Sequence, residues 1–218
     1  MKKNVNVKKK EDFFLKKLII LISILFSILF ATSCVSISSL FSKDTYKISL
    51  SRNIMGPGFL TATDLADFFL SQNPAANKKE VYEIATYYVY EGMAEGVNYS
   101  VAFAQMCLET GYLKFGNLVT PEMHNYCGLG AMDAEHPGES FATMQLGVRA
   151  HIQHLQAYGT TEDQQLKNQL IDPRYSWVHK TKYIETIEGL SGTWATDPNY
   201  AVKLENILNK IEESVGLN

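Results

Sequence analysis

Several kinds of functional sequence are absent from this chain of 218 residues. It has no glycine-rich phosphate loop, no Ser-His-Asp order of a hydrolase triad, no set of cysteines for zinc and no internal repeat. His151 and His154 have a spacing that some metal ligands use, but the glutamate of a metalloprotease motif does not accompany them. We therefore expect both histidines to form hydrogen bonds on or between helices. No metal and no cofactor is implied.

Positive charge is also scarce once the N-terminus is set aside. Residues 1–33 hold 7 of the 20 Lys and Arg and 2 of the 23 Asp and Glu, so 13 basic and 21 acidic residues remain, a net charge of −8. Binding to nucleic acid depends on neutralising phosphates, for which an acidic domain is poorly suited. We therefore expect no nucleic-acid partner.

The first 34 residues are typical of a bacterial export signal. Seven lysines precede an apolar stretch over 18–31, which is shorter than the roughly 20 residues that span a membrane. Small residues then lead to Cys34, as in a lipobox, where the cysteine is lipidated and anchors the protein to the membrane. Cleaved secretion and an uncleaved membrane anchor are the alternatives. In each case the domain works outside the cytoplasm, in the cell envelope or secreted.

The remaining chain divides into a tether and one domain. Residues 35–58 are rich in serine and end in Gly-Pro-Gly, which predicts a tether, and residues 59–218 are long enough for one compact core. We expect a monomer. Beyond the leader only Cys107 and Cys127 remain, and they either form a disulfide or stay as buried thiols.

Helical periodicity dominates the domain. The spacing of apolar residues predicts helices over 64–70, 79–95, 99–113, 143–158, 182–190 and 200–215. Residues 117–140 have no period and predict an irregular insertion, with room for a short β-hairpin over 126–132. Long loops inside compact domains usually carry function. The expected fold class is therefore mainly α, with a functional insertion.

Glu109 is the most informative side chain, because it follows an almost wholly apolar helix and precedes Gly111. Helical spacing places Gln105 and Tyr112 on the same side, and Gly111 can end the helix in the left-handed conformation. Apolar neighbours and the negative helix end both disfavour ionisation, so the carboxyl can act as a general acid near neutral pH. The alternative is an ordinary glutamate that extends into solvent.

Five segments resemble, in the same order, the N-acetylglucosaminidases of glycoside hydrolase family 73. They are residues 102–112 (AFAQMCLETGY), 125–131 (NYCGLGA), 140–158 (SFATMQLGVRAHIQHLQAY), 172–175 (DPRY) and 194–200 (WATDPNY). The resemblance covers roughly residues 60–215. It implies a lysozyme-like, mainly helical α+β fold around a substrate cleft. It also implies that the glycan strands of peptidoglycan are cut after N-acetylglucosamine.

The resemblance also implies roles for single residues. The proton donor of the family maps onto Glu109, and its active-site tyrosine maps onto Tyr200. The second catalytic group is sought in the insertion, where Glu122, Asp133, Glu135 and Glu139 are the candidates; we place Glu122 and Glu135 first, although no motif singles one out. Other matched positions are expected to bind the glycan, the aromatic ones by stacking on sugar faces: Gln105, Tyr112, Asn125, Tyr126, Gly128 and Trp194. Tyr126 is the favoured stacking residue, because it lies beside the Gly-Leu-Gly turn.

Three mechanisms remain open at this point. An inverting enzyme needs a second carboxylate about 6.5–9.5 Å from the acid, and a retaining enzyme needs one at about 5–5.5 Å. Substrate assistance needs neither, because the 2-acetamido oxygen of the sugar attacks its own anomeric carbon. Two other functions are also open. One is a muramidase or lytic transglycosylase, and the other is a glycan-binding lipoprotein without activity.

Overall fold

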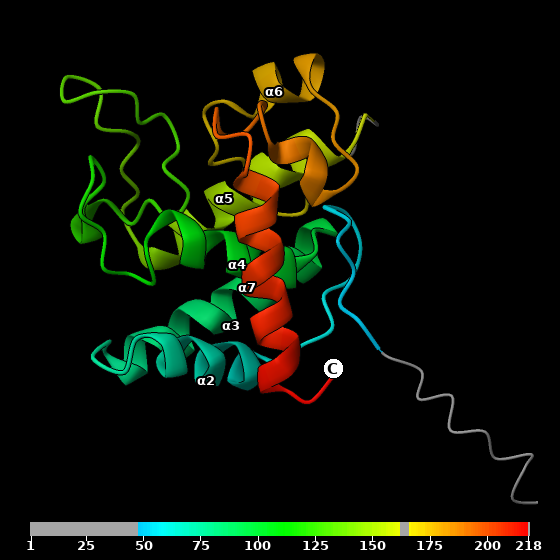
Figure 1. The fold of residues 1–218 in the computed structure, drawn as a ribbon. Coiled ribbons are helices and arrows are strands. Elements are labelled where there is room, and N and C mark those ends of the chain that lie inside the picture. The colour runs from blue at the N-terminus through cyan, green and yellow to red at the C-terminus, as the bar shows by residue number, and fades with distance from the viewer. Residues whose placement is uncertain (1–47, 162–165, 218) are drawn as a thin grey trace, which may run out of the picture. The chain divides into compact units, whose positions relative to one another are not determined.

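The computed structural model describes residues 48–161 and 166–217, and regular secondary structure within them is helical. The elements are α2 (Ala62–Gln72), α3 (Lys78–Glu95), α4 (Tyr99–Glu109), η1 (Pro121–Met123), α5 (Met144–Gly159), α6 (Tyr175–Thr181), η2 (Ile187–Leu190) and α7 (Tyr200–Ser214) (Figure 1). The described residues form only isolated β-bridges besides these helices. The mainly α class is therefore confirmed.

Capping residues in the sequence explain where the helices begin and end. Thr61 caps α2 in a capping box with Asp64. Asn98 caps α4 by accepting hydrogen bonds from the backbone of Ser100 and Val101. Gly96 ends α3 in the left-handed conformation, with φ 69°. The tight connection between α3 and α4 sets the direction in which α4 runs.

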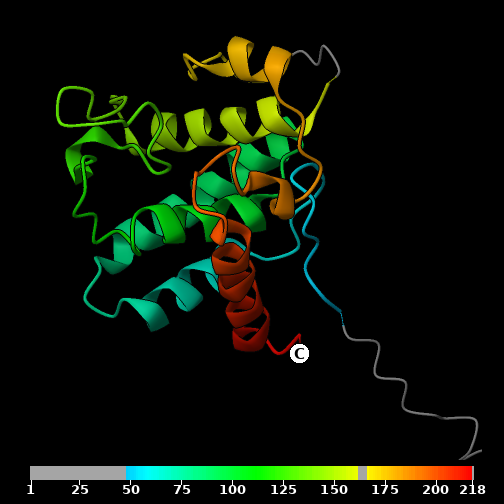
Figure 2. The ribbon, with the colours of Figure 1, turned by 45° about the horizontal axis from the view of Figure 1, so that its top comes forward.

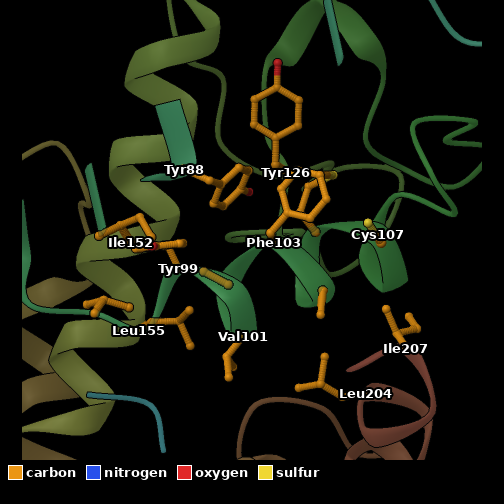
Figure 3. Packing of buried hydrophobic residues seen from close by; sticks show 14 of the residues in the cluster. Tyr88, Tyr99, Val101, Phe103, Cys107, Tyr126, Ile152, Leu155, Leu204 and Ile207 are labelled. Atoms are coloured by element: carbon orange, nitrogen blue, oxygen red, sulfur yellow. The ribbon is translucent and has the colours of Figure 1, made fainter. Parts of the chain in front are cut away.

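Helix α4 lies at the centre of the core. Its first nine residues are buried, which explains why the sequence is apolar on all sides of this helix. The helix packs against α3, α5 and α7. Figure 3 shows Phe103 beside Tyr88 of α3, and their rings meet edge to face with centroids 5.6 Å apart. Packing on several sides fixes the position of the last residue of the helix, Glu109.

The structure corrects two of the predicted helices. Helix α4 ends at Glu109 and not near 113, because Gly111 is left-handed as expected but Tyr112 and Leu113 are left-handed too, each with φ 59°. In the second case, residues 182–186 are not helical, and the chain forms the seven-residue α6 before them and η2 after them. Helices this short contain too few turns to show a clear period.

The insertion is irregular, and the hairpin over 126–132 does not form. The structure has η1 and one isolated bridge between Asp133 and His136. The Asp133 side chain accepts hydrogen bonds from the backbone N–H groups of Glu135 and His136, which holds a tight turn in place of a ladder. Gly147 lets the insertion approach α5, since a Cβ there would lie 1.8 Å from the carbonyl oxygen of His124.

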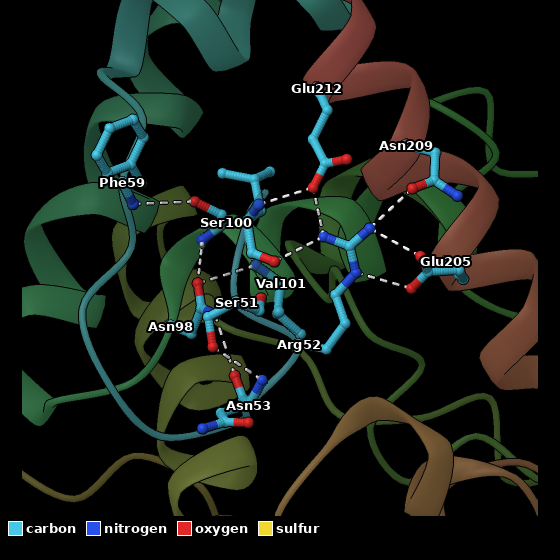
Figure 4. A network of polar contacts seen from close by, with 11 residues as sticks. Ser51, Arg52, Asn53, Phe59, Asn98, Ser100, Val101, Glu205, Asn209 and Glu212 are labelled. Carbon is cyan, nitrogen blue, oxygen red and sulfur yellow. Dashed lines mark hydrogen bonds and ion pairs between the residues drawn. The ribbon is translucent and has the colours of Figure 1, made fainter. Parts of the chain in front are cut away.

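Residues 48–58 belong to the domain, which corrects their assignment to the tether. Leu50 and Ile54 are buried in the core. The Arg52 guanidinium forms ion pairs with Glu205 and Glu212 of α7, at 2.7 and 2.5 Å (Figure 4). The serines and the Gly-Pro-Gly run favour a tether, and they draw attention away from these few anchoring residues.

The leader and Cys34 lie outside the described residues. Among the residues described, none of the helices combines the length and the apolar character that a bilayer crossing requires. Cys107 and Cys127 are free and buried in different hydrophobic clusters. Of the two alternatives for these cysteines, the structure has the buried thiols.

Candidate active site

A hollow of about 280 Å³ opens where α4 ends. We call it the Glu109 hollow. Its walls come from the end of α4, from the insertion and from the segment before α7. The lining residues are Glu109, Thr110, Phe115, Asn117, Leu118, Val119, Asn125, Cys127, Gly128, Ala131, Trp194 and Ala195. The insertion therefore forms much of the wall of the hollow.

One oxygen of the Glu109 carboxyl accepts two hydrogen bonds. Tyr200 Oη donates to Glu109 Oε1 at 2.5 Å, and Trp194 Nε1 donates to the same oxygen at 3.0 Å. These two donors occupy both lone pairs of Oε1, so the acidic proton resides on Oε2. Oε2 faces Gly128, where a Cβ would lie only 3.9 Å from it. The proton is thus held on the side where the hollow opens.

Burial raises the pKa of Glu109 above its usual value of 4.5, and the hydrogen bonds from Tyr200 and Trp194 lower it by a smaller amount. Desolvation disfavours the charged carboxylate, whereas two donors on one oxygen favour it. The carboxyl therefore stays protonated to higher pH than a free glutamate. Its conjugate base also has two donors ready to stabilise the charge once the proton has left.

A buried chain of hydrogen bonds continues behind Tyr200. Gln105 Nε2 of α4 donates to Tyr200 Oη at 2.8 Å. The amide oxygen of Gln105 lies 3.0 Å from His151 Nε2 of α5, and His151 Nδ1 lies 2.8 Å from the hydroxyl of Tyr88 of α3. The four residues link four helices and end at Glu109. We call them the relay.

The relay has a single direction of donation. Burial lowers the pKa of His151 to about 3, so the ring is neutral and has one donor and one acceptor. The Gln105 oxygen can only accept, which places the His151 proton on Nε2 and makes Nδ1 the acceptor for Tyr88. Because Tyr200 already accepts from Gln105, its own proton is directed to Glu109. The relay therefore orients the donor that stabilises the carboxylate.

Trp194 is held by aromatic neighbours as well as by Glu109. Its ring lies 5.1 Å from that of His154 and 5.4 Å from that of Tyr158, centroid to centroid. His154 is fixed in turn by the buried carboxylate of Asp172, with Nδ1 and Oδ2 2.8 Å apart. His151 and His154 thus join helices and neighbouring segments through hydrogen bonds, as expected for this pair.

Two predicted glycan-binding residues shape the wall of the hollow. Asn125 donates to the carbonyls of Leu129 and Glu139 and accepts from the backbone of Leu129, so its side chain holds the turn of the insertion together. Gly128 has φ 65°, a conformation that favours glycine. Together they bring the backbone of the insertion close to Glu109.

Three other predicted glycan-binding residues do not line the hollow. Gln105 is fully buried in the relay. Tyr126 is only 2% exposed and belongs to the hydrophobic core (Figure 3). Tyr112 packs against Phe68 and Phe69 of α2. Burial leaves Gln105 and Tyr126 no free surface for a sugar, which corrects the expectation for these two residues. The chain turns left-handed after Glu109 and directs Tyr112 to α2, and contact of the half-buried Tyr112 with the sugar stays a prediction.

The two favoured candidates for a second catalytic acid are not brought to Glu109 either. Glu122 and Glu135 are exposed, and neither lines the hollow. Glu135 belongs to the turn that Asp133 closes. Among the described residues that line the Glu109 hollow, Glu109 has the only carboxyl group. Asp133 is exposed as well, and Glu139, which is half-buried beside Gly130, is not among the lining residues of the hollow.

Sequence reasoning missed Tyr88 and Thr110. In the sequence, Tyr88 has the spacing of an ordinary core residue of the helix over 79–95. The one indication of its role is that a buried tyrosine hydroxyl needs a hydrogen-bond partner, which a histidine on a neighbouring helix can supply. Thr110 caps the end of α4 by donating to the Met106 carbonyl and accepting from the backbone of Leu113. Within 48–161 and 166–217 no three His, Cys, Asp or Glu side chains gather as a metal site would require.

A helical domain whose hollow contains one half-buried, hydrogen-bonded glutamate is typical of a glycoside hydrolase. Comparison with known proteins gives the same class. The family model of mannosyl-glycoprotein endo-beta-N-acetylglucosaminidases matches residues 85–213, more than half of the chain, and the chain belongs to this glucosaminidase family. It is thereby a glycoside hydrolase that acts on glycan.

The chain is also similar to a protein of Borreliella burgdorferi that bears the name uncharacterized protein. The two are 42% identical over 150 residues, which cover 69% of this chain and 72% of the other. No solved structure matches the chain. The matched family range contains α4, the insertion, the Trp194 segment and nearly all of α7, so all parts of the Glu109 hollow lie within it.

Proposed function

We propose that the protein cuts peptidoglycan at the β-1,4 bond that follows N-acetylglucosamine, with Glu109 as the general acid. The single observation that carries the proposal is the half-buried Glu109 carboxyl, which lines the hollow and accepts hydrogen bonds on Oε1 from Tyr200 and Trp194. Membership of the glucosaminidase family supports the choice of sugar. The acid gives its proton from Oε2 to the glycosidic oxygen as the bond breaks.

The substrate's own acetamido group is the proposed nucleophile. The carbonyl oxygen of the 2-acetamido group attacks C1, the bond to the leaving sugar breaks, and a cyclic oxazolinium forms. Water then adds to C1 and gives a proton back to the Glu109 carboxylate, which reopens the ring and restores the acid. This mechanism is favoured because the lining residues of the hollow offer no second carboxylate.

The stereochemistry of the first product tests the mechanism. Two successive inversions at C1 keep the β configuration, so NMR of freshly cleaved glycan should show the β-anomer before it equilibrates. An α-anomer would require a water activated by a protein base and would refute substrate assistance. As a second test, Glu122→Gln and Glu135→Gln should each change kcat/KM less than twofold. A decrease of a hundredfold or more in kcat/KM for either variant would show that an acid of the insertion takes part in the reaction.

The proposed place of work is the cell envelope, with the protein acting as a monomer anchored through a lipid on Cys34. The basic and apolar leader and the small residues before Cys34 support this proposal. Mass spectrometry of the N-terminal peptide of the mature protein should find a lipid-modified Cys34. A mature chain that starts elsewhere, or an unmodified cysteine, would contradict the anchor without bearing on Glu109.

A further inference from the structure

A second hollow, of about 240 Å³, adjoins the Glu109 hollow. The two share part of their walls, because Cys127, Gly128, Ala131 and Trp194 line both. A linear polymer that passes over Gly128 and beside Trp194 can therefore occupy both hollows at once. We call the second one the basic hollow.

Two cations without carboxylate partners line the basic hollow. Arg174 and Lys182 flank α6 on either side, and no Asp or Glu is among the lining residues. Helix α6 lies along α5 (Figure 2), which brings His154 and Tyr158 to the same hollow. Among the described residues, neither cation has an acid within ion-pair distance.

The nearest acid in the sequence is already engaged elsewhere. The Asp172 side chain is fully buried, and its two oxygens accept from His154 Nδ1 and from the backbone N–H of Arg174, each at 2.8 Å. Both oxygens of the Asp172 carboxylate are therefore already hydrogen-bonded inside the protein, and Asp172 is not among the lining residues. The basic hollow is left with a net positive lining.

The Arg174 guanidinium is also positioned before any ligand arrives. Its Cζ lies 5.6 Å from the ring centroid of Trp177, whose side chain is 54% exposed. Stacking on an aromatic face restrains a guanidinium while its N–H groups at the edge stay free. Those N–H groups match the planar, two-oxygen geometry of a carboxylate.

The sign of this lining is opposite to that of the domain, since residues 34–218 have a net charge of −8. Unpaired cations in a cleft of an acidic protein concentrate anions at that place. Peptidoglycan carries carboxylates: the lactyl ether of muramic acid ends in one where no stem peptide is attached, and a stem peptide that is joined to it by an amide bond has others. Muramic acid is the neighbour of N-acetylglucosamine along the strand.

We propose that the basic hollow binds a carboxylate of muramic acid or of its stem peptide through Arg174 and Lys182, while N-acetylglucosamine occupies the Glu109 hollow. The inference rests on the proposed function and extends it. It makes the site selective for peptidoglycan over glycans of N-acetylglucosamine alone, which have no carboxylate.

Equilibrium binding to the full-length Glu109→Gln protein tests the proposal without turnover. Three probes are compared at 50 mM salt: soluble glycan with stem peptides, the same glycan stripped to its lactyl carboxylates, and a chitin hexasaccharide. We expect at least one carboxylate-bearing probe to bind about tenfold more tightly than the hexasaccharide, as for loss of one charge-assisted hydrogen bond. The tighter of the two identifies the source of the carboxylate.

Substitutions in the same background assign the preference to the two cations. Arg174→Gln with Lys182→Gln should reduce it to twofold or less, whereas Arg174→Lys with Lys182→Arg should keep most of it. Lys180→Gln with Lys210→Gln removes the same charge from exposed positions outside the hollow and serves as the control. Far-UV circular dichroism checks the fold of each variant.

Two results would overturn the proposal. One is equal affinity for all three probes in the Glu109→Gln protein, and the other is a preference that survives the double glutamine substitution or falls as much in the control. Failure of the wild-type chain to cut peptidoglycan would instead refute the proposed function. The binding preference is measured separately, so the two failures are distinguishable.

Discussion

Tyr200→Phe removes one hydroxyl from the relay and should change how Glu109 titrates. The hydroxyl donates to Oε1 of Glu109 at 2.5 Å and accepts from Gln105. A hydrogen bond to a charged acceptor contributes about 1.5–3 kcal/mol and one to a neutral acceptor about 0.5–1.5 kcal/mol, so its loss disfavours the carboxylate by roughly 1.4 kcal/mol. That free energy corresponds to a factor of about ten in the ionisation constant.

The assay is the pH dependence of kcat/KM on soluble peptidoglycan fragments. The general acid is active while protonated, and activity falls as the pH rises through its pKa. We expect Tyr200→Phe to move this descending limb about one pH unit upward. The plateau value of kcat/KM should also fall roughly threefold to tenfold. The lost hydrogen bond stabilises the negative charge that develops on Glu109 in the transition state, when the proton is partly transferred. Gln105 Nε2 loses its acceptor, which costs about 1–3 kcal/mol of stability.

Tyr126→Phe is the matched control, since it removes the hydroxyl of another buried tyrosine that lies outside the relay. Its descending limb should coincide with that of the wild type. A Tyr200→Phe profile with an unmoved limb would refute the reasoning, even if the rate fell, because the rate alone could fall through altered packing.

The remaining predictions concern stability and protonation. Because burial raises the pKa of Glu109, the folded state keeps a proton that the unfolded state releases above about pH 4.5, so ionisation lowers stability as the pH rises. Glu109→Gln should therefore gain Tm relative to the wild type between acidic and neutral pH, and a difference in Tm that does not grow with pH would contradict this. His151 should stay neutral with its proton on Nε2 down to about pH 3, as seen in ¹⁵N shifts of the ring; titration near its usual pKa of about 6.5 would contradict the relay. Glu91→Gln leaves the Arg149 guanidinium without its buried partner and should cost about 3 kcal/mol in urea unfolding, whereas a loss below about 1 kcal/mol would show that the pair is dispensable.

The position of Glu109 could be predicted because it follows from local rules. The apolar run of α4 predicts a buried helix, and a glycine two residues after the glutamate predicts where the helix ends. Both features depend on neighbours in the sequence, so no knowledge of the tertiary structure is needed. The raised pKa follows from the same burial.

The relay could not be predicted in the same way. Gln105 and Tyr200 are 95 residues apart, and Tyr88 and His151 are 63 apart. Whether such side chains meet depends on how α3, α4, α5 and α7 cross, which a single sequence does not reveal. The sequence therefore predicts that Gln105 binds the substrate, whereas its side-chain amide forms hydrogen bonds with Tyr200 and His151 inside the protein.

The site residues of the insertion could not be predicted either, but for a different reason than the relay. Without a helical or strand period, nothing in its sequence tells which side chains face the cleft. Tyr126 and Glu135 were both credible site residues on composition, yet one is buried in the core and the other lies in an exposed turn. The residues that do face Glu109 include Gly128, whose contribution is the absence of a side chain.

The most direct test of the central claim is the chemical identity of the ends that the enzyme creates. Purified sacculi are digested with the full chain in mild detergent, the products are reduced with borohydride, and the fragments are analysed by mass spectrometry. We expect reduced N-acetylglucosamine at the new ends and no such ends with Glu109→Gln. New ends of muramic acid, in the reducing or the 1,6-anhydro form, or undiminished cleavage by Glu109→Gln, would contradict it.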